Sequence, residues 1–356
     1  MSKKSLLFLS SHLPSKSVPQ AGQAIAFDRL EEYARDYDIY LMAFVNEAEK
    51  GHAGPALEKL CSQVSLFEVS LRQRVVGILT HPALPVRVAS RIHPGFDAEL
   101  RRVLRERRFD RVHFEYTSVG HYLDRVSHVE EQLLIEHDVT YQSFQRKMEG
   151  SSGVRRFLYR LEYGRQKAWE LDVLHRVQRI GTLNFKDRDL LVADGVDPAK
   201  IEVFPPKVDE RFKKVTREKV VAGTILLWGA MGRTENSDAV FWFLDEIFPR
   251  VKERVPHAKV SVVGANPPAR MLERASECVE VTGFVEDPIP YFERAQVGAA
   301  PLRLGAGIKI KVLEFMAAGL PVVATTVAAE GIDGEMRIAD DARGFADALC
   351  ETLTQG

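Results

Sequence analysis

The stretch that decides the fold lies near the end of the chain and reads APLRLGAGIKIKVLEFMAAGLPVVA over residues 300–324. This pattern predicts a strand, a glycine turn, a helix over Lys309–Ala318, a glycine stop and a second strand. A glycine turn that leads into a helix can seat a diphosphate, because the first turn of a helix carries unpaired backbone N–H groups. Lys309 or Lys311 would add positive charge at that place.

The same alternation of strand and helix extends along the rest of the chain. Apolar runs with little polar alternation, as expected for parallel strands covered on both faces, precede longer helical patterns. Repeated units of this kind predict an α/β protein with doubly wound parallel sheets. The predicted strands are Leu6–Leu9, Ile39–Phe44, Val64–Val69, Arg111–Tyr116, Gln132–Ile135, Thr224–Trp228, Lys259–Val263, Gln296–Ala300 and Pro321–Ala324. The further predicted helices are Ala26–Asp36, Ala98–Arg107 and Asp238–Arg254.

One proline-rich seam predicts where the chain divides. A chain of 356 residues is long enough for two hydrophobic cores. Pro205 and Pro206 follow a short strand and precede the charged stretch Glu210–Lys219. Adjacent prolines stiffen the backbone and cannot continue a helix. We therefore predict two Rossmann-like domains, residues 1–205 and 206–356, with one large sheet and a proline turn as the alternative.

Composition and missing motifs exclude several classes of protein. The formal net charge is -1, which argues against a nucleic-acid binder. Three scattered cysteines form no CxxC pair, and the apolar run Leu6–Leu9 is too short for a signal peptide, so a cytoplasmic protein is expected. The first strand is not followed by G-x-G-x-x-G, and the chain has neither a P-loop nor HExxH. We predict no metal site and no bound cofactor.

A second glycine turn follows the predicted strand Thr224–Trp228. Gly229 would let a ligand approach the backbone, and Arg233 would place planar donors and a fixed charge beside a phosphate. The alternative is an ordinary strand–helix turn in which Asn236 or Asp238 caps the helix.

Glu314 is the most informative acidic residue of the second half. It lies about two turns into the helix of the opening stretch, among apolar neighbours. A buried carboxylate needs hydrogen-bond donors, and the two hydroxyl groups of a ribose would supply them. The alternative is an internal pair with Lys311 or Arg303.

Several segments, taken in order, resemble one enzyme family. The strongest are GIKIKVLE at residues 307–314, MAAGLPVVAT at 316–325 and EGI at 330–332. Weaker ones are IEHDV at 135–139, IEVFPP at 201–206, NSDAV at 236–240, VVG at 262–264 and TGFVED at 282–287. Together they resemble the retaining family-four glycosyltransferases of the GT-B fold, the glycosyl transferases group 1.

The resemblance implies two Rossmann-like domains that face each other across a cleft. The first would bind the acceptor, and the second would bind a nucleotide-diphosphate sugar of the UDP or GDP type. His137 would contact the transferred sugar as the catalytic residue, and no metal would be needed, because basic groups and helix ends stabilise the leaving diphosphate. The implied donor-binding residues are Gly22, Gly229, Arg233, Phe284, Val285, Gly307, Ile308, Lys309, Lys311 and Glu314.

Two departures from the family pattern concern the donor site. The family motif has two glutamates separated by seven residues, and Ala306 stands where the first would be. The lysine that usually follows Arg233 is also missing, and Lys309 or Lys311 would replace its charge.

Arginine-rich stretches in the first half suggest an anionic partner. Residues 72–111 hold ten arginines and four acids, including the run RRVLRERR at 101–108. Such a run would suit anionic lipid headgroups or a lipid-linked acceptor at the inner face of a membrane. Val154–Arg179 interleaves arginines with aromatic residues, which suits either an interfacial helix or the solvated face of a packed helix.

The sequence therefore predicts a glycosyltransferase that transfers a sugar with retention to a glycan or lipid-linked acceptor. Synthesis of a surface polysaccharide or another glycoconjugate is the expected setting. Two alternatives stay open, namely a GT-B-type nucleotide-sugar epimerase and a non-catalytic subunit that binds a nucleotide sugar. Ala306 motivates the second of these.

Overall fold

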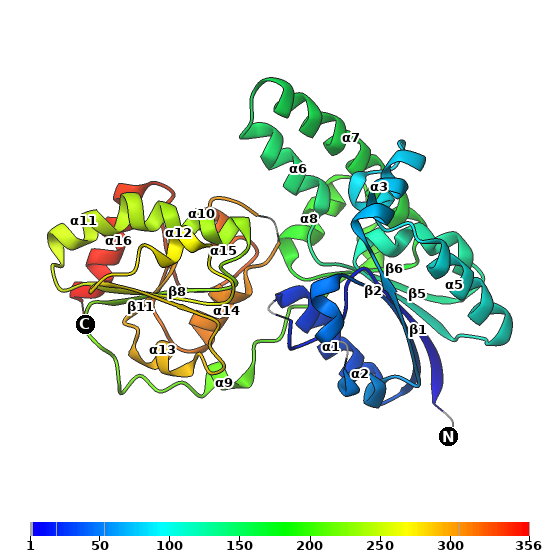
Figure 1. Ribbon diagram of the computed structural model, residues 1–356, viewed down its shortest axis with the longest axis horizontal. Helices are drawn as coiled ribbons and strands as arrows, with labels where there is room; N and C mark the ends of the chain where they lie inside the picture. Colours follow the sequence, from blue (N-terminus) through cyan, green and yellow to red (C-terminus); the bar gives the residue numbers. More distant parts are fainter. Residues whose placement is uncertain (1–2, 19, 53, 306, 356) are drawn as a thin grey trace. The chain divides into compact units, whose positions relative to one another are not determined.

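The chain divides between its two adjacent prolines into two compact units, Met1–Pro205 and Pro206–Gly356. The computed structural model describes residues 3–18, 20–52, 54–305 and 307–355. In these ranges each unit is built on one parallel sheet with helices on both faces (Figure 1). The predicted fold class, two doubly wound Rossmann-like units, is confirmed.

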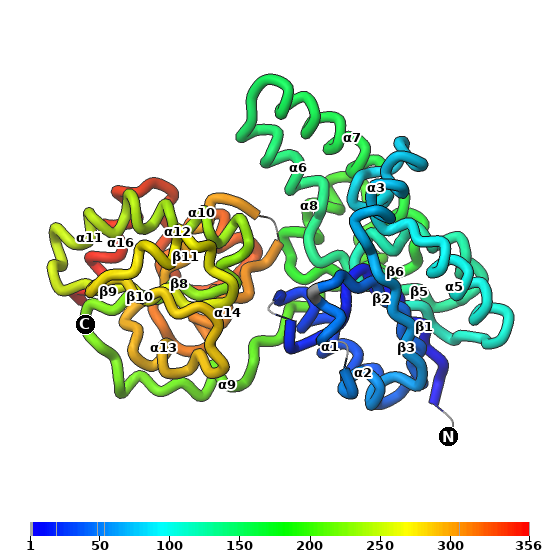
Figure 2. Tube along the Cα trace, in the orientation of Figure 1, coloured from blue at the N-terminus to red at the C-terminus, as the bar shows by residue number. Residues whose placement is uncertain are grey.

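The described part of unit 1 holds a seven-stranded sheet in the order β3-β2-β1-β4-β5-β6-β7. Figure 2 follows β2 between β1 and β3. Because β1 pairs with both β2 and β4, the direction of winding reverses between β1 and β4. Ligands of doubly wound sheets bind at the carboxyl edge of such a switch point. The strands are β1 (Lys4–Ser10), β2 (Tyr37–Val45), β3 (Gln63–Glu68), β4 (Arg111–Glu115), β5 (Glu131–Glu136), β6 (Arg179–Thr182) and β7 (Ile201–Val203).

Alternate residues of β1 face two separate cores. Leu6 and Phe8 pack with α1 (Ala21–Tyr33) and α2 (Pro55–Leu60), whereas Leu7 and Leu9 belong to the core that α5 (Pro94–Glu106) covers. A continuous apolar run is what a strand buried on both faces requires. The remaining helices of the unit are α3 (Leu71–Thr80), α4 (Val86–Ala89), α6 (Thr140–Glu149), α7 (Gly153–Arg176) and α8 (Phe185–Ala193), with 3-10 turns at Glu47–His52, Thr117–Val126 and Pro198–Lys200.

The described part of unit 2 repeats this plan with six strands in the order β10-β9-β8-β11-β12-β13. Its switch point lies between β8 and β11, which pair in parallel. The strands are β8 (Thr224–Trp228), β9 (Lys259–Val263), β10 (Val279–Gly283), β11 (Val297–Ala300), β12 (Val322–Ala324) and β13 (Arg337–Ile338). One face is covered by α10 (Thr234–Trp242), α11 (Phe248–Arg254) and α16 (Ala342–Thr354), and the other by α9 (Glu210–Lys213), α13 (Ile289–Arg294) and α14 (Ile310–Ala317) (Figure 1). Short helices α12 (Ala269–Leu272) and α15 (Thr326–Ala329) complete the unit.

One predicted helix differs from the structure. The pattern Asp238–Arg254 predicts a single helix, but α10 begins at Thr234 and is joined to α11 by a π-helical turn, Phe243–Ile247. Pro249 has no N–H to donate to the carbonyl four residues earlier, so the backbone widens ahead of it. In the described ranges no helix combines the length and the hydropathy that crossing a membrane requires.

Candidate functional site

Three neighbouring strands of unit 2 finish on glycines with positive φ. Gly229 follows β8 at φ +145°, Gly264 follows β9 at φ +146°, and Gly283 ends β10 at φ +73°. A Cβ atom on Gly264 would lie 1.7 Å from the carbonyl oxygen of Gly229. The backbones are therefore packed against each other without room for side chains. This edge of the sheet presents backbone to a ligand.

The two helices that flank the switch point begin without a side-chain cap. Arg233 is the N-cap of α10 and Lys309 is the N-cap of α14, and neither side chain accepts a hydrogen bond from its helix. The first N–H groups of each helix carry partial positive charge and favour an anion.

The alternative in which Asn236 or Asp238 caps the helix is wrong. Both residues lie inside α10, which begins at Thr234. Asn236 Nδ2 instead donates to the carbonyl oxygen of Ala230 at 2.7 Å. Asp238 accepts two hydrogen bonds from Arg303, at 2.7 and 3.0 Å. Arg303 therefore pairs with Asp238 and not with Glu314.

Lys311 reaches back from α14 to the end of β8. Its Nζ donates to Asn236 Oδ1 at 2.6 Å and would lie 2.9 Å from a Cβ on Gly229. Burial lowers the pKa of Lys311 to about 7, and the nearby positive charge of Arg233 acts in the same direction. Within the described ranges no carboxylate lies within ion-pairing distance of this ammonium group. Lys309 donates to the carbonyl oxygen of Gly307 at 2.5 Å.

Glu314 lies one turn further along α14. The indole N–H of Trp228 donates to its Oε2 at 2.6 Å. Burial raises the pKa of Glu314 to about 7, against the opposing effect of the indole hydrogen bond. The alternative in which Glu314 pairs internally with Lys311 or Arg303 is wrong, because those cations bond to Asn236 and Asp238.

The other candidate donor-binding residues lie on the loops of the same sheet edge. Phe284 follows β10 and its side chain is 73% exposed, whereas Val285 packs against the core beneath it. Gly307 has φ +71° and precedes the partly buried Ile308. Ala306 lies outside the described residues. Arg233 is exposed, with its Nε 3.6 Å from Glu235.

In unit 1, His137 lies directly after β5 and is nearly buried. Its Nε2 is 2.6 Å from Glu115 Oε1, and its ring stacks on Tyr116 at a centroid distance of 3.9 Å. Gly22, in the first turn of α1, faces both rings. A Cβ there would lie 2.6 Å from Tyr116 Oη and 3.3 Å from His137 Nδ1. The structure therefore brings Gly22 and His137 together.

Glu115 is a fully buried carboxylate between two histidines. His113 Nε2 bonds to Glu115 Oε2, Arg29 Nε lies 3.5 Å from the same oxygen, and Tyr33 contacts His113 Nδ1 at 3.2 Å. Burial acts to raise the pKa of Glu115, but the histidines and Arg29 hold it well below its ordinary value. Burial also lowers the pKa of His113, so this ring is neutral and donates through Nε2. The ionised Glu115 thus fixes the His137 ring, whose Nδ1 faces Gly22.

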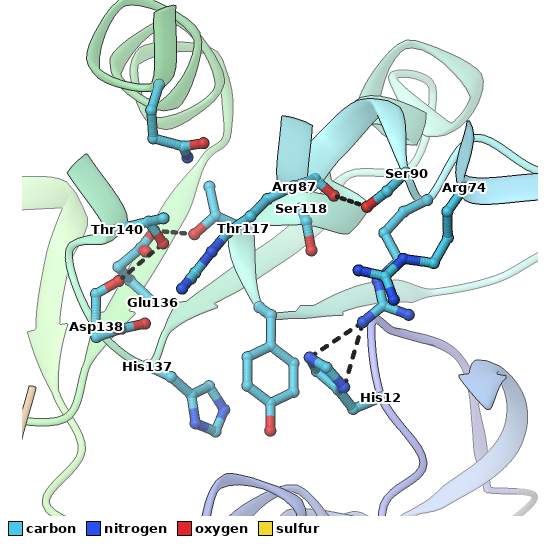
Figure 3. Close-up of a pocket in the computed structure, with 13 residues that line it drawn as sticks. His12, Arg74, Arg87, Ser90, Thr117, Ser118, Glu136, His137, Asp138 and Thr140 are labelled. Atoms are coloured by element: carbon cyan, nitrogen blue, oxygen red, sulfur yellow. Dashed lines mark hydrogen bonds between the residues drawn. The ribbon is translucent and has the colours of Figure 1, made fainter. Parts of the chain in front are cut away.

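The hydrogen-bonded series His113, Glu115 and His137 forms a relay in unit 1. A pocket of about 330 Å³ opens beside it (Figure 3). Its lining includes the basic residues Arg74, Arg87 and Arg91, the histidines His12 and His137, and the acids Glu136 and Asp138. His12, Glu115 and the three arginines are not among the predicted site residues. The sequence does contain a signal for the pair His113 and Glu115. They are two residues apart on β4, so their side chains lie on the same face of the sheet. In the described part of the chain no three His, Cys, Asp or Glu side chains are grouped as a metal site requires.

Comparisons with known proteins agree with this architecture. Residues 222–355, nearly all of unit 2, match the model of the family described as glycosyl transferases group 1. No curated protein matches the sequence. Among solved structures, Anabaena HepE in complex with UDP-glucose superposes with a TM-score of 0.64 at 12% identity, covering 99% of this chain and 90% of that one.

Two further structures have the same fold. Sucrose-phosphate synthase from Thermosynechococcus elongatus gives a TM-score of 0.64 at 14% identity, over 99% of this chain and 90% of its own. An S. aureus TarM mutant, in complex with Fondaparinux, alpha-GlcNAc-glycerol and UDP, gives 0.64 at 10% identity, over 98% and 92%. The predicted resemblance is therefore confirmed, through the family match in unit 2 and through the fold across both units.

Proposed function

We propose that this chain, whose second unit is a domain of the glycosyl transferases group 1, transfers a sugar from a nucleotide-diphosphate sugar to a glycan or lipid-linked acceptor. The observation that carries the proposal is the switch point of unit 2. Glycine strand ends, two uncapped helices and the buried ammonium group of Lys311 meet there. Such a set of donors and charges matches a diphosphate.

The diphosphate would lie against Gly229, Gly307 and the starts of α10 and α14. The lowered pKa of Lys311 supports this position, because a buried positive charge with Arg233 and Lys309 nearby is unfavourable until an anion joins them. Lys311 is the residue that replaces the family's missing lysine, since its Nζ lies beside Asn236, shortly after Arg233 in the chain. The same groups would stabilise the charge of the leaving diphosphate, so transfer would need no metal.

Glu314 would hold the ribose. The indole N–H of Trp228 occupies one carboxylate oxygen and fixes its direction, which leaves acceptor capacity for two hydroxyl groups. The exposed ring of Phe284, with the backbone of Val285, would contact the base. UDP is the favoured nucleotide over GDP, because HepE and the TarM mutant were both solved with it.

We propose that the reaction proceeds with retention and that His137 contacts the transferred sugar. Its Nδ1 is available because Glu115 engages Nε2, and Gly22 leaves the space in front of it open. A fixed imidazole can donate to or accept from a sugar hydroxyl without losing entropy during the reaction.

A role in surface polysaccharide or glycoconjugate synthesis, at the inner face of a membrane, is supported by the first half of α7. Phe157, Leu158 and Leu161 are 50–59% exposed there, with Arg160 between them and two more arginines just before. In the second half of the same helix, Val173 and Leu174 are buried in the core. Only the exposed half has the composition of an interfacial helix.

Calorimetry with UDP and GDP tests the donor site, after a thermal-shift screen of nucleotide sugars has named the best ligand. Glu314→Ala should weaken UDP binding by about tenfold or more, because a charged hydrogen-bond acceptor is lost. Glu277→Ala, at an exposed glutamate of the same unit, is the matched control. Unchanged affinity for every nucleoside diphosphate in Glu314→Ala would contradict the assignment. A converted sugar in the absence of acceptor would instead favour the epimerase alternative.

A further inference from the structure

Two groups of arginines in unit 1 differ in whether acidic side chains pair with them, a difference that the sequence does not reveal. Those of α5 and its surroundings bond to nearby acids. Arg101 pairs with Asp97, and Arg102 pairs with Glu99 at 2.8 Å. These two cations are neutralised locally, so part of the positive charge of the run at 101–108 is already balanced within α5. Arg107 and Arg111 are likewise paired, with Asp38 and Glu131.

The second group consists of Arg74, Arg87 and Arg91, and it lines the pocket of unit 1. Arg74 comes from α3, while Arg87 and Arg91 come from α4 and the turn after it. In the described part of the chain none of the three has a carboxylate within ion-pairing distance. Figure 3 shows Arg74 on the same side of the pocket as His12, whereas the side chain of Arg87 extends toward Thr117 and Asp138. The Arg87 guanidinium carbon lies 5.8 Å from the centroid of the Phe144 ring.

Arg91 is the most buried member of the group. Burial lowers its pKa to about 10, and its NH2 makes only long contacts, of 3.4 and 3.5 Å, with the His12 ring. Burial and the charge of Arg91 in turn lower the pKa of His12, which is therefore neutral. The charge of Glu49 opposes the effect of burial on Arg91. A guanidinium taken out of water without a direct ion pair still gains from an anion that binds beside it.

The acidic residues of the pocket do little to offset this charge. Burial and the neighbouring Glu170 raise the pKa of Glu136 well above its ordinary value, and burial raises the pKa of Glu170 to about 8. Both shifts favour the neutral carboxyl, so Asp138 is the lining acid whose charge they leave unreduced beside the three arginines.

We propose that this pocket binds a phosphate group of the acceptor substrate. A carboxylate is matched by one guanidinium fork, whereas three forks suit a group with more oxygen atoms and a double charge. This inference rests on the proposed function, because it places the acceptor in unit 1, and it deepens that function by naming the acceptor as a phosphate ester.

The test is a titration of the full chain with glycerol 3-phosphate in the presence of saturating UDP, which keeps the phosphate site of unit 2 occupied. Arg74→Gln and Arg87→Gln should each weaken binding by about tenfold, since each removes a charge-assisted fork. Both side chains are exposed, so the fold should tolerate the changes. Arg101→Gln removes the same charge outside the pocket and should change the affinity by less than about twofold.

A parallel arm uses phosphatidylcholine vesicles with and without phosphatidic acid. Binding of glycerol 3-phosphate and of the phosphatidic acid vesicles, both weakened by Arg87→Gln, supports a phosphate site open to soluble acceptors. Vesicle binding alone, again weakened by Arg87→Gln, supports a lipid phosphate. Absence of both kinds of binding, or equal losses in Arg101→Gln, would overturn the proposal. If UDP itself fails to bind, the donor assignment is wrong, and the same titration without UDP still reports on the pocket.

Discussion

The two units share one topology but finish their central strands differently. In unit 2 the strands β8, β9 and β10 lead into Gly229, Gly264 and Gly283. In unit 1 the strands β4 and β5 lead directly into Tyr116 and His137, whose rings stack. A glycine edge lets a ligand reach the backbone, whereas an edge with side chains places fixed functional groups beside it. Under the proposed function, the same fold would provide one edge for binding the donor and one for chemistry.

The charges at the two edges differ in the same way. The buried carboxylate of Glu115 has both histidines and Arg29 around it. Among the described residues, the ammonium group of Lys311 has one hydrogen-bond partner, the amide oxygen of Asn236, and burial lowers its pKa to about 7. The charge of Glu115 is thus balanced within unit 1, whereas the proposed diphosphate would balance the charge of Lys311 in unit 2.

The largest effect that tests this contrast is expected at His137. His137→Ala should lower sugar transfer by about a hundredfold or more, as loss of a positioned imidazole commonly does. UDP affinity should stay within about twofold, because the nucleotide contacts unit 2. Turnover with the best nucleotide sugar, together with calorimetry for UDP, measures both quantities. His128→Ala, at an exposed histidine of the same unit, is the control, and full turnover in His137→Ala would remove the chemical role from unit 1.

A pair of glycine substitutions compares the two edges directly. Gly264→Ala should lower the free energy of unfolding of unit 2 by about 3 kcal/mol, because φ is +146° and the new Cβ meets a backbone oxygen that cannot move away. Gly22→Ala should destabilise the protein less than Gly264→Ala does, because it lies in a helix and its Cβ meets side-chain atoms of Tyr116 and His137, not a backbone oxygen. Gly22→Ala should nevertheless lower turnover, because the new Cβ would lie 3.3 Å from His137 Nδ1. Thermal unfolding and activity assays separate the two outcomes, and equal destabilisation would contradict the comparison.

The difference between the units also explains how far the sequence could predict them. The edge of unit 2 depends on local glycines and on the spacing from Gly307 to Glu314, so both turns and helix α14 follow from the sequence alone. The partners of Lys311 and Glu314 do not, because Asn236 and Trp228 are 75 and 86 residues away in the chain.

The site of unit 1 was harder to predict for the same reason. Glu115 is a single polar residue at the end of a strand, and only the parallel register of β4 with β5 brings it to His137. The arginine count predicted an anionic partner but pointed to residues 101–108, whose Arg101 and Arg102 are paired within α5. Short strands such as β6 and β13 were missed because they contain too few apolar residues to form a pattern.

The buried Glu170 gives the next effect in size. Its pKa is raised to about 8 by burial, so the folded state keeps a proton that the unfolded state releases near pH 4.5. Its contribution to stability is complete below that pH and is lost as the pH rises toward 8. Between pH 6 and 7.5 the loss should be about 2 kcal/mol.

Glu170→Gln should flatten this dependence while keeping the hydrogen bonds. Thr140 N would still donate to Oε1, and the Gln166 amide, whose Oε1 has no partner in the described structure, can turn to accept. Hydrogen exchange of the β5 amides at the two pH values measures the effect. Glu149→Gln, at an exposed glutamate of α6, should leave the slope as it is. An unchanged slope in Glu170→Gln would assign the pH dependence to another group.

The smallest expected effect is the pH dependence of UDP affinity, which tests whether a bound diphosphate balances the charge of Lys311. In the free protein the ammonium group loses its proton above pH 7, whereas a bound diphosphate would retain it. The Kd for UDP should therefore rise about tenfold per pH unit between pH 7.5 and 8.5, where UDP is already fully ionised. Lys311→Arg should abolish this slope, because guanidinium stays charged. Glu314→Gln should keep it, since that carboxyl, whose pKa is also about 7, would no longer titrate. A slope that disappears in Glu314→Gln but persists in Lys311→Arg would transfer the pH dependence to the carboxylate, and the ammonium group could no longer be regarded as the charge that awaits the diphosphate.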